Sequence, residues 1–201
     1  SVPDIDYHHG NGTQDIFYDR ADLLTVAIHR HPSFAYPCFA GFADERGEGA
    51  GEGCNHNFPL PEHVEDDAYL ETLARALSIV VRFDPRYLVL SMGLDIAKGD
   101  PTGAWAITPD GFERIGGTLA GLGLPTLVVQ EGGYDTRVIG RNARQLLGGM
   151  QGGGYERRLP PRGADPHRGP RRLAGSPVAG QTRPRHPGGS GRITPLAMLL
   201  V

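Results

Sequence analysis

The chain has 201 residues, a length that suits one domain with its own hydrophobic core. Its formal net charge is −3, and since residues 151–201 carry nine Arg against two acidic residues, residues 1–150 are strongly acidic, which argues against nucleic acid as a partner. No apolar stretch approaches the roughly 18 residues that a membrane span needs, and the opening SVPDIDYHHG lacks the charged and apolar zones of a signal peptide, so we expect a cytoplasmic protein.

Apolar runs and amphipathic segments alternate between residues 23 and 147. Runs rich in β-branched and apolar residues predict buried strands at residues 23–28, 87–92 and 126–129. Apolar residues at helical spacing predict helices at residues 64–83, 109–122 and 138–147, the second with Thr108 as its N-cap and Pro109 at its first position. The Gly-rich and acidic segment 40–57 is predicted to be a surface loop.

This alternation predicts an α/β fold, in which a parallel sheet carries helices on both faces. We expect one domain over residues 1–150. Such domains bind their ligands at the carboxyl ends of the strands. Polar residues that directly follow a predicted strand are therefore the candidate site residues.

Residues 151–201 differ in composition, because Gly, Pro and Arg dominate them and Lys is absent. We predict a disordered tail here, and we also consider that this stretch is read out of frame from a GC-rich gene. Cys38 and Cys54 belong to no disulfide or metal motif and are expected to be free thiols in a reducing compartment.

The first candidate site is the motif DIDYHHGNG near the start of the chain. If the segment is extended, Asp4, Asp6 and His8 project from one face, since side chains alternate along a strand. Carboxylate and imidazole donors suit a cation such as zinc. The alternative from spacing alone is a solvated polar edge.

Two further polar residues follow predicted strands. Asp95 comes three residues after the strand at 87–92, where it could complete a three-ligand site with Asp6 and His8, although an Asp that merely starts a turn is the alternative. Tyr134 follows the strand at 126–129 in the run QEGGYD. Its phenol could donate a hydrogen bond to a developing oxyanion, and the alternative is a packed or interface tyrosine.

Together, DIDYHHGNGTQ, SMGLDIAKGDP and VVQEGGY resemble the signature of the histone deacetylase superfamily, with the closest likeness to bacterial acetylpolyamine amidohydrolases and class II-like deacetylases. The likeness covers residues 2–150 and implies an arginase/deacetylase-like sheet. It implies that Asp6, His8 and Asp95 bind Zn²⁺ and that Tyr134 is catalytic. It further implies that Asp4 and Asn11 lie behind the ligands and orient catalytic histidines.

The resemblance implies metal-assisted hydrolysis of an acetyl amide in a small acetylated amine or in acetyl-lysine. It also implies a monovalent cation, such as K⁺, held by the backbone around Asp4, Asp6 and His8. One family ligand to that cation is a serine hydroxyl, and Ala27 stands at its position. Occupancy of the cation site is therefore open.

The sequence departs from the family pattern at its beginning. The adjacent catalytic histidines of the family precede the DxDxHH motif, and here only residues 1–3 precede it. We expect the C-terminal half of a catalytic domain that is inactive by itself, with an unpaired sheet edge that favours instability or self-association into a homo-oligomer. His29 and His31 are expected to be ordinary strand-end histidines rather than a replacement base.

Two alternatives to an active deacetylase remain at this point. The first is a catalytically dead relative that binds metal or acylated ligands without turnover. The second is an arginase-type hydrolase with a two-metal site, which is weakened because the residue two positions after His8 is Gly10 rather than Asp.

Overall fold

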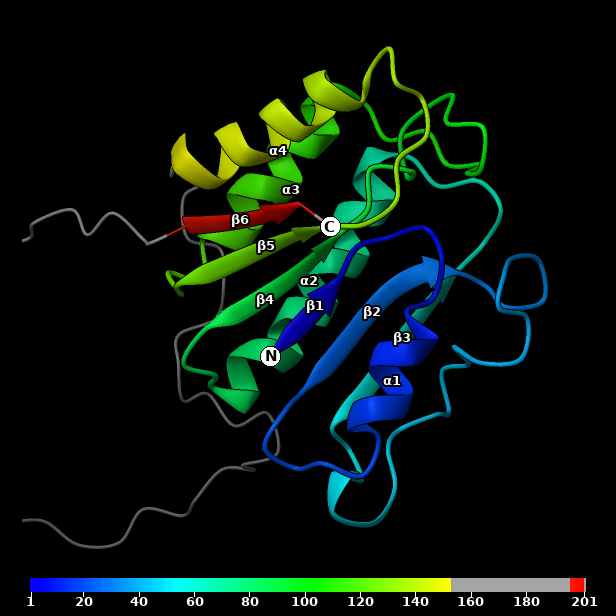
Figure 1. Cartoon of the computed structure of the whole chain (residues 1–201), viewed down its shortest axis with the longest axis vertical. Helices are drawn as coiled ribbons and strands as arrows, with labels where there is room; N and C mark the ends of the chain where they lie inside the picture. Colours follow the sequence, from blue (N-terminus) through cyan, green and yellow to red (C-terminus); the bar gives the residue numbers. More distant parts are fainter. Residues whose placement is uncertain (153–195, 201) are drawn as a thin grey trace, which may run out of the picture. The chain divides into compact units, whose positions relative to one another are not determined.

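The computed structural model describes residues 1–152 and 196–200. The elements in this part of the chain follow one another as shown in Figure 1: β1 (Val2–Asp4), α1 (Asn11–Phe17), β2 (Thr25–Arg30), the 3₁₀ helix η1 (Gly49–Gly51), β3 (Asn55–Leu60), α2 (Asp66–Phe83), β4 (Leu88–Met92), α3 (Pro109–Ala120), β5 (Thr126–Gln130), α4 (Ile139–Gly152) and β6 (Leu196–Leu200). The alternation of strands and helices predicted from the sequence is confirmed.

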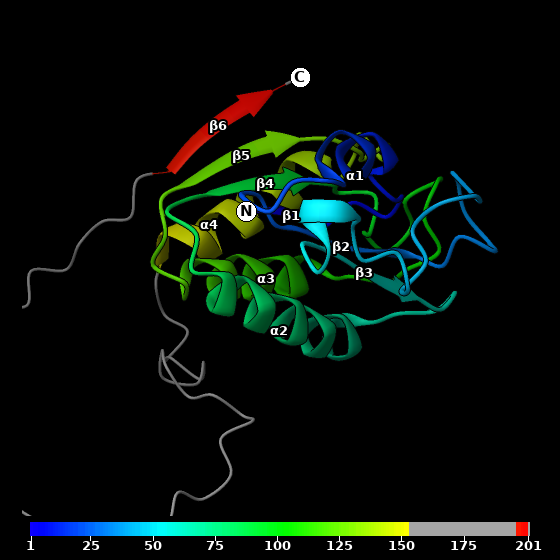
Figure 2. The ribbon, with the colours of Figure 1, turned by 90° about the horizontal axis from the view of Figure 1, so that it is seen from below.

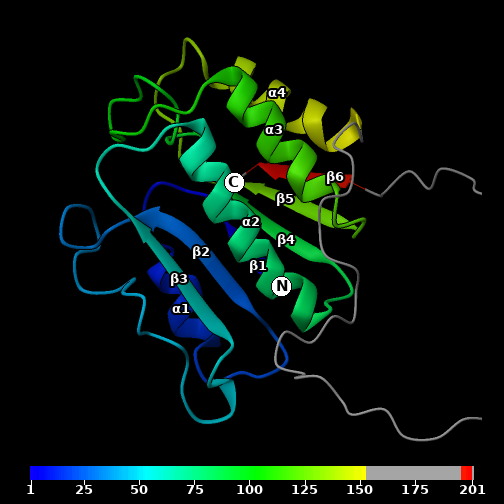
Figure 3. The ribbon, with the colours of Figure 1, turned by 180° about the vertical axis from the view of Figure 1, so that it is seen from behind.

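The strands form one parallel sheet in the order β3-β2-β1-β4-β5-β6. Helix α1 lies on one face of this sheet, and α2 and α3 lie on the other, as Figures 2 and 3 show from two sides. Helices therefore cover both faces, as predicted. Because the strands are parallel, their carboxyl ends meet at one edge of the sheet, where the candidate residues lie.

The hydrophobic core lies between the sheet and the helices of the second face. Helix α2 contributes Leu73 and Leu77, both 1% exposed, and β4 contributes Leu88 and Leu90, both 0% exposed. Burial of each such side chain contributes about 2 kcal/mol relative to exposure. This packing fixes β4, and with it the loop that carries Asp95.

The start of α3 confirms the predicted cap. The Thr108 hydroxyl accepts a hydrogen bond from the Gly111 amide at 3.1 Å, and Pro109 is the first helical residue. The carboxylate of Asp66, in the first turn of α2, accepts hydrogen bonds from the amide and the hydroxyl of Thr108. The two helix starts are thereby joined.

Three elements differ from the sequence-based expectation. Helix α1 has seven residues, of which only Gln14 is buried, so it shows no apolar periodicity. Strand β3 begins at Asn55, inside the segment predicted to be loop. The strand was not predicted, because its buried residues Asn55 and Asn57 are amides rather than apolar side chains. A polar inward face hides a strand from pattern reading.

The third difference lies in the segment predicted to be a disordered tail. Leu196–Leu200 forms β6, which pairs with β5 in parallel register, so that this edge of β5 is paired. Helix α4 also runs to Gly152, two residues past the expected domain boundary. The rest of the predicted tail, residues 153–195 and 201, lies outside the described residues. Among the described residues, no helix is long and apolar enough to cross a membrane.

Candidate metal centre

The candidate residues come from three loops at the carboxyl ends of neighbouring strands. Asp6 and His8 follow β1, Asp95 follows β4, and Tyr134 follows β5. Since β1, β4 and β5 are adjacent in the sheet, these loops lie side by side. The order of the strands therefore brings together residues that are far apart in the sequence.

Three side chains form a compact cluster. Nδ1 of His8 lies 3.1 Å from Oδ2 of Asp95 and 3.4 Å from Oδ1 of Asp6. One ligand atom from each of the three residues lies within 4.8 Å of the other two. Asp95 is fully buried and Asp6 is 9% exposed. The predicted grouping of Asp6, His8 and Asp95 is thus present in the structure.

The path of the chain through this cluster differs from the extended segment assumed from spacing. Strand β1 ends at Asp4, and the backbone bends at Tyr7 and His8 before α1 begins. The carboxylates act as backbone acceptors within this turn: Asp4 Oδ1 accepts from the Asp6 amide at 2.9 Å, and Asp6 Oδ1 accepts from the His8 amide at 2.8 Å. The side chains converge because of these bonds rather than because of strand alternation.

The other two loops close around the carboxylates. Asp95 Oδ1 accepts a hydrogen bond from the Tyr7 amide at 3.0 Å, and Asp6 Oδ2 accepts one from the Gly132 amide at 2.9 Å. A Cβ at Gly132 would lie 2.5 Å from Oδ2 of both Asp6 and Asp95. Only glycine therefore allows the β5 loop to approach the cluster this closely.

The cluster changes the protonation of its members. Hydrogen bonds to Asp6 and Asp95 raise the pKa of His8 to about 9. Burial opposes ionisation of Asp6, but its hydrogen bonds with His8 and Gly132 outweigh burial and lower its pKa. Burial raises the pKa of Asp95 above its usual value. One imidazolium can balance only one of the two buried carboxylates, so a second positive charge is needed for both to be ionised.

This donor set fits a zinc ion. Two carboxylates and one imidazole nitrogen are the nitrogen and oxygen ligands that zinc accepts, and three protein ligands leave a further coordination position open for chemistry. Within the described residues, the only ion pairs of Asp6 and Asp95 are those with His8. A divalent cation would neutralise both carboxylates.

Tyr134 lies at the rim of the cluster and is 55% exposed. Partial burial, followed by the nearby charges of Asp6 and Asp95, raises the pKa of its phenol. The phenol is therefore protonated at neutral pH and available as a hydrogen-bond donor. Tyr134 stands two residues after Gly132, whose amide donates to the ligand Asp6. Its catalytic role stays a prediction.

Of the two residues expected behind the ligands, Asp4 contacts the cluster, because its Oδ1 accepts a hydrogen bond from the Asp6 amide. Asp4 is 7% exposed, and burial raises the pKa of its carboxyl well above the usual value. Asn11 is the first residue of α1, and its backbone N–H donates to the His9 carbonyl at 2.9 Å. Ala27 on β2 carries a methyl group and offers no side-chain ligand to a cation.

His9, His29 and His31 contact groups other than the three ligands. The rings of His9 and His29 contact each other at a tilt of 47°, with centroids 4.6 Å apart, and they are 5% and 0% exposed. Nδ1 of His29 lies 2.8 Å from the Arg30 carbonyl, and burial lowers the pKa of His29 to about 4. His31 follows β2, and its Nδ1 accepts from the Ser33 amide. His29 and His31 thus lie at the end of β2, and their lack of a role as base stays a prediction.

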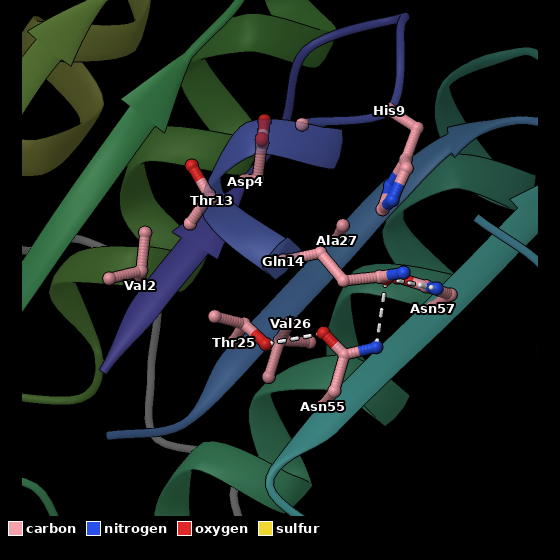
Figure 4. Close-up of a pocket in the computed structure, with 11 residues that line it drawn as sticks. Val2, Asp4, His9, Thr13, Gln14, Thr25, Val26, Ala27, Asn55 and Asn57 are labelled. Atoms are coloured by element: carbon pink, nitrogen blue, oxygen red, sulfur yellow. Dashed lines mark hydrogen bonds between the residues drawn. The ribbon is translucent and has the colours of Figure 1, made fainter. Parts of the chain in front are cut away.

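Figure 4 shows a cavity between α1 and strands β1 to β3. The amides of Asn55 and Asn57 both donate to Gln14 Oε1, at 3.0 and 2.8 Å, and Gln14 donates to Glu45 at 2.7 Å. The cavity volume of about 10 Å³ holds about one water molecule, so it is too small for an acetylated amine. Sequence reading missed this network, because isolated amides carry no spacing signal.

Sequence reading also missed Asp100, which lies in the quoted stretch SMGLDIAKGDP. Its carboxylate is 5% exposed and accepts hydrogen bonds from the amides of Tyr134 and Asp135. A Gly-Asp-Pro sequence is typical of a turn, and that pattern gave no sign of a contact across the site.

Fold and site together define a protein of the histone deacetylase family: residues 1–150 match the Histone deacetylase domain, and the chain belongs to this family. Acetylpolyamine amidohydrolase 1 of Pseudomonas aeruginosa is 48% identical over 152 residues, which are 76% of this chain and 44% of the relative. Histone deacetylase 15 of Arabidopsis thaliana is 37% identical over 162 residues, 79% of this chain and 29% of the relative.

Solved structures agree with this assignment. The crystal structure of acetylpolyamine aminohydrolase from Burkholderia pseudomallei superposes with a TM-score of 0.74 at 47% identity, covering 76% of this chain and 44% of that chain. The HDA15 HD domain superposes with a TM-score of 0.67 at 37% identity, covering 73% of this chain and 42% of that chain. The chain thus spans less than half the length of these relatives.

Proposed function

We propose that these residues belong to an enzyme that hydrolyses the acetyl amide of a small acetylated amine, such as an acetylated polyamine or acetyl-lysine, with zinc held by Asp6, His8 and Asp95. The observation that carries this proposal is the convergence of the three ligand atoms within 4.8 Å of one another. The names of the relatives, acetylpolyamine amidohydrolase and histone deacetylase, support the substrate class.

The residues of this chain would divide the work as follows. Zinc bound by the three ligands would polarise the amide carbonyl and acidify a water molecule. The Tyr134 phenol would donate a hydrogen bond to the oxygen that becomes negative as the carbonyl is attacked. The Gly132 and Tyr7 amides would hold the carboxylates of Asp6 and Asp95 in orientation through their hydrogen bonds.

We further propose that these 201 residues alone do not turn over substrate. Hydrolysis needs a base that accepts the proton of the attacking water. Within the described residues, His8 is used as a ligand, and His9 and His29 are buried against each other. The base would come from the pair of histidines that the family resemblance implies. A metal-binding protein without turnover is the alternative function, and the burial of His9 and His29 against each other supports it.

A monovalent cation near Asp4, Asp6 and His8 is a secondary part of the proposal. The backbone carbonyls around Asp4, Asp6 and His8 would be its ligands, since Ala27 supplies no hydroxyl. The midpoint of urea unfolding in potassium chloride, compared with tetramethylammonium chloride at equal ionic strength, tests this part. Equal midpoints would remove the cation from the proposal.

Two measurements test the main proposal. Zinc titration of the chain by calorimetry should give one site per chain, and absence of binding would overturn the ligand assignment. Acetate release from an acetylated polyamine and from an acetyl-lysine peptide should occur with the protein encoded by the intact natural gene. Zinc binding without acetate release from that protein would support the inactive alternative.

A further inference from the structure

The buried carboxylate of Asp100 links the loop that carries Tyr134 to the loop that carries Asp95 through hydrogen bonds. Oδ2 of Asp100 accepts hydrogen bonds from the amides of Tyr134 at 2.7 Å and Asp135 at 3.2 Å. Its Oδ1 accepts from the amide and the hydroxyl of Thr102, at 2.9 and 2.8 Å. Four donors thus satisfy one carboxylate that is 5% exposed. Hydrogen bonds to an ionised acceptor are among the stronger ones in proteins.

A second fastening point lies two residues earlier in the same loop. Leu94, which directly precedes the ligand Asp95, donates its backbone amide to the Gly132 carbonyl at 2.8 Å. Between the two points, Gly133 has a φ of 138°, and a Cβ there would lie 2.9 Å from the Leu94 Cβ. The segment from Gly132 to Tyr134 is therefore hydrogen-bonded to the β4 loop at both ends. Its middle position, Gly133, accepts only glycine.

Asp100 is also connected to the metal ligand within its own loop. Its amide donates to the Ala97 carbonyl at 3.1 Å, and the Ala97 amide donates to the Leu94 carbonyl at 3.3 Å. Successive turns thus link Leu94, next to the ligand Asp95, to Asp100. A rigid connection of this kind fixes the distance between the ligand and the anchored backbone of Tyr134.

We propose that Asp100 is a positioning residue, which holds the Tyr134 phenol at a fixed place relative to the metal bound by Asp6, His8 and Asp95. Tyr134 is 55% exposed, so its ring has little packing of its own to hold it. The Asp100 carboxylate supplies the order that packing does not. This inference rests on the proposed function for its catalytic meaning, but the anchoring itself can be measured without turnover.

The test uses the full chain labelled for NMR, loaded with Co²⁺ alone as a paramagnetic probe of the metal site. The chain has seven Tyr, and the signal of the Tyr134 ring is assigned by its loss in Tyr134→Phe. In the wild type, the Co²⁺-induced shift of this ring should be large. In Asp100→Ala, motion should average it to about half or less. Hydrogen exchange of the Tyr134 amide should become about tenfold faster or more, since a charge-assisted bond is lost.

Matched variants separate positioning from a general loss of structure. Thr102→Val removes a hydroxyl bonded to the other oxygen of Asp100 and should leave the Tyr134 shift and exchange unchanged. Asp66→Ala removes a carboxylate that likewise accepts from a threonine amide and hydroxyl, but at α2 and α3. It should destabilise the fold without moving Tyr134. If Asp100→Ala does not fold, Asp100→Asn is used, for which a smaller change of the same kind is expected.

The outcomes distinguish the two proposals. Unchanged exchange and unchanged ring shift in a folded Asp100 variant would overturn the positioning role. Absence of any Co²⁺-induced shift in the wild type would overturn the metal site, while the exchange rate of the Tyr134 amide would still decide whether Asp100 anchors the loop. Equal acceleration in Asp66→Ala would reduce Asp100 to a purely structural residue.

Discussion

Nδ1 of His8 lies 3.1 Å from Oδ2 of Asp95, although 87 positions separate the two residues in the sequence. The contact exists because β1 and β4 are neighbours in the sheet and run in the same direction. Asp6 joins the pair from the β1 side, and the β5 loop closes over them through Gly132. The cluster therefore depends on the loops after three strands, and substitutions in these loops test its parts separately.

Replacement of Asp95 by alanine should abolish zinc binding. One of three ligands is lost, and two remaining ligands do not make a stable zinc site. Calorimetric titration of the folded variant measures this directly. Asp110→Ala is the control, since Asp110 is an exposed acid in the first turn of α3 and should leave zinc binding unchanged. Wild-type stoichiometry in Asp95→Ala would exclude Asp95 as a ligand.

Tyr134→Phe should separate metal binding from turnover in an active protein that contains these residues. Only the phenol oxygen is removed, so the zinc content should stay at the wild-type level. Loss of one oxyanion donor should lower kcat by about 10² to 10³. Tyr87→Phe serves as the control, because Tyr87 is similarly exposed, at 60%, and precedes β4 at the opposite end of the strand. A Tyr134→Phe enzyme with near-normal kcat would have another oxyanion donor.

Gly132→Ala should weaken zinc binding, although Gly132 supplies no side-chain ligand. The added methyl would lie 2.5 Å from Oδ2 of both Asp6 and Asp95, so one of the carboxylates must move. Gly148→Ala is the contrasting substitution, because nothing lies within 4 Å of the added Cβ on the exposed side of α4. There, alanine should stabilise the helix by about 0.5–1 kcal/mol and leave zinc affinity unchanged. Equal zinc affinity in both variants would contradict the close approach of the β5 loop.

The sequence predicted the parts of the fold whose pattern is apolar. Strands β4 and β5 and helices α2 and α3 bury regular sets of apolar residues, so their periodicity was visible. Strand β3 was missed because its inward residues Asn55 and Asn57 bond to Gln14, a contact that only the tertiary structure creates.

The same division applies to the site. Asp6, His8 and Asp95 could be found because each follows a strand and together they match a family motif. Asp100 lies in a turn sequence, and its bond to the Tyr134 amide follows from the adjacency of β4 and β5, which spacing along the chain does not contain. Residues that act through backbone contacts leave no pattern of their own.

His29→Gln should reduce the acid sensitivity of the fold. Burial lowers the pKa of His29 to about 4 in the folded state, while the unfolded chain has the usual value of about 6.5. Below about pH 6.5, His29 is protonated in the unfolded state but stays neutral in the folded state. The contribution of neutral His29 to stability is therefore present above about pH 6.5 and is lost as the pH falls toward about 4.

Urea unfolding of both proteins at about pH 7.5 and about pH 5 provides the measurement. Other groups in the chain titrate in this range, so the informative quantity is the stability of the wild type minus that of the variant. This difference should shift against the wild type by about 2 kcal/mol between the two pH values. A difference that does not change with pH would mean that His29 is solvated enough to take up its proton in the folded state.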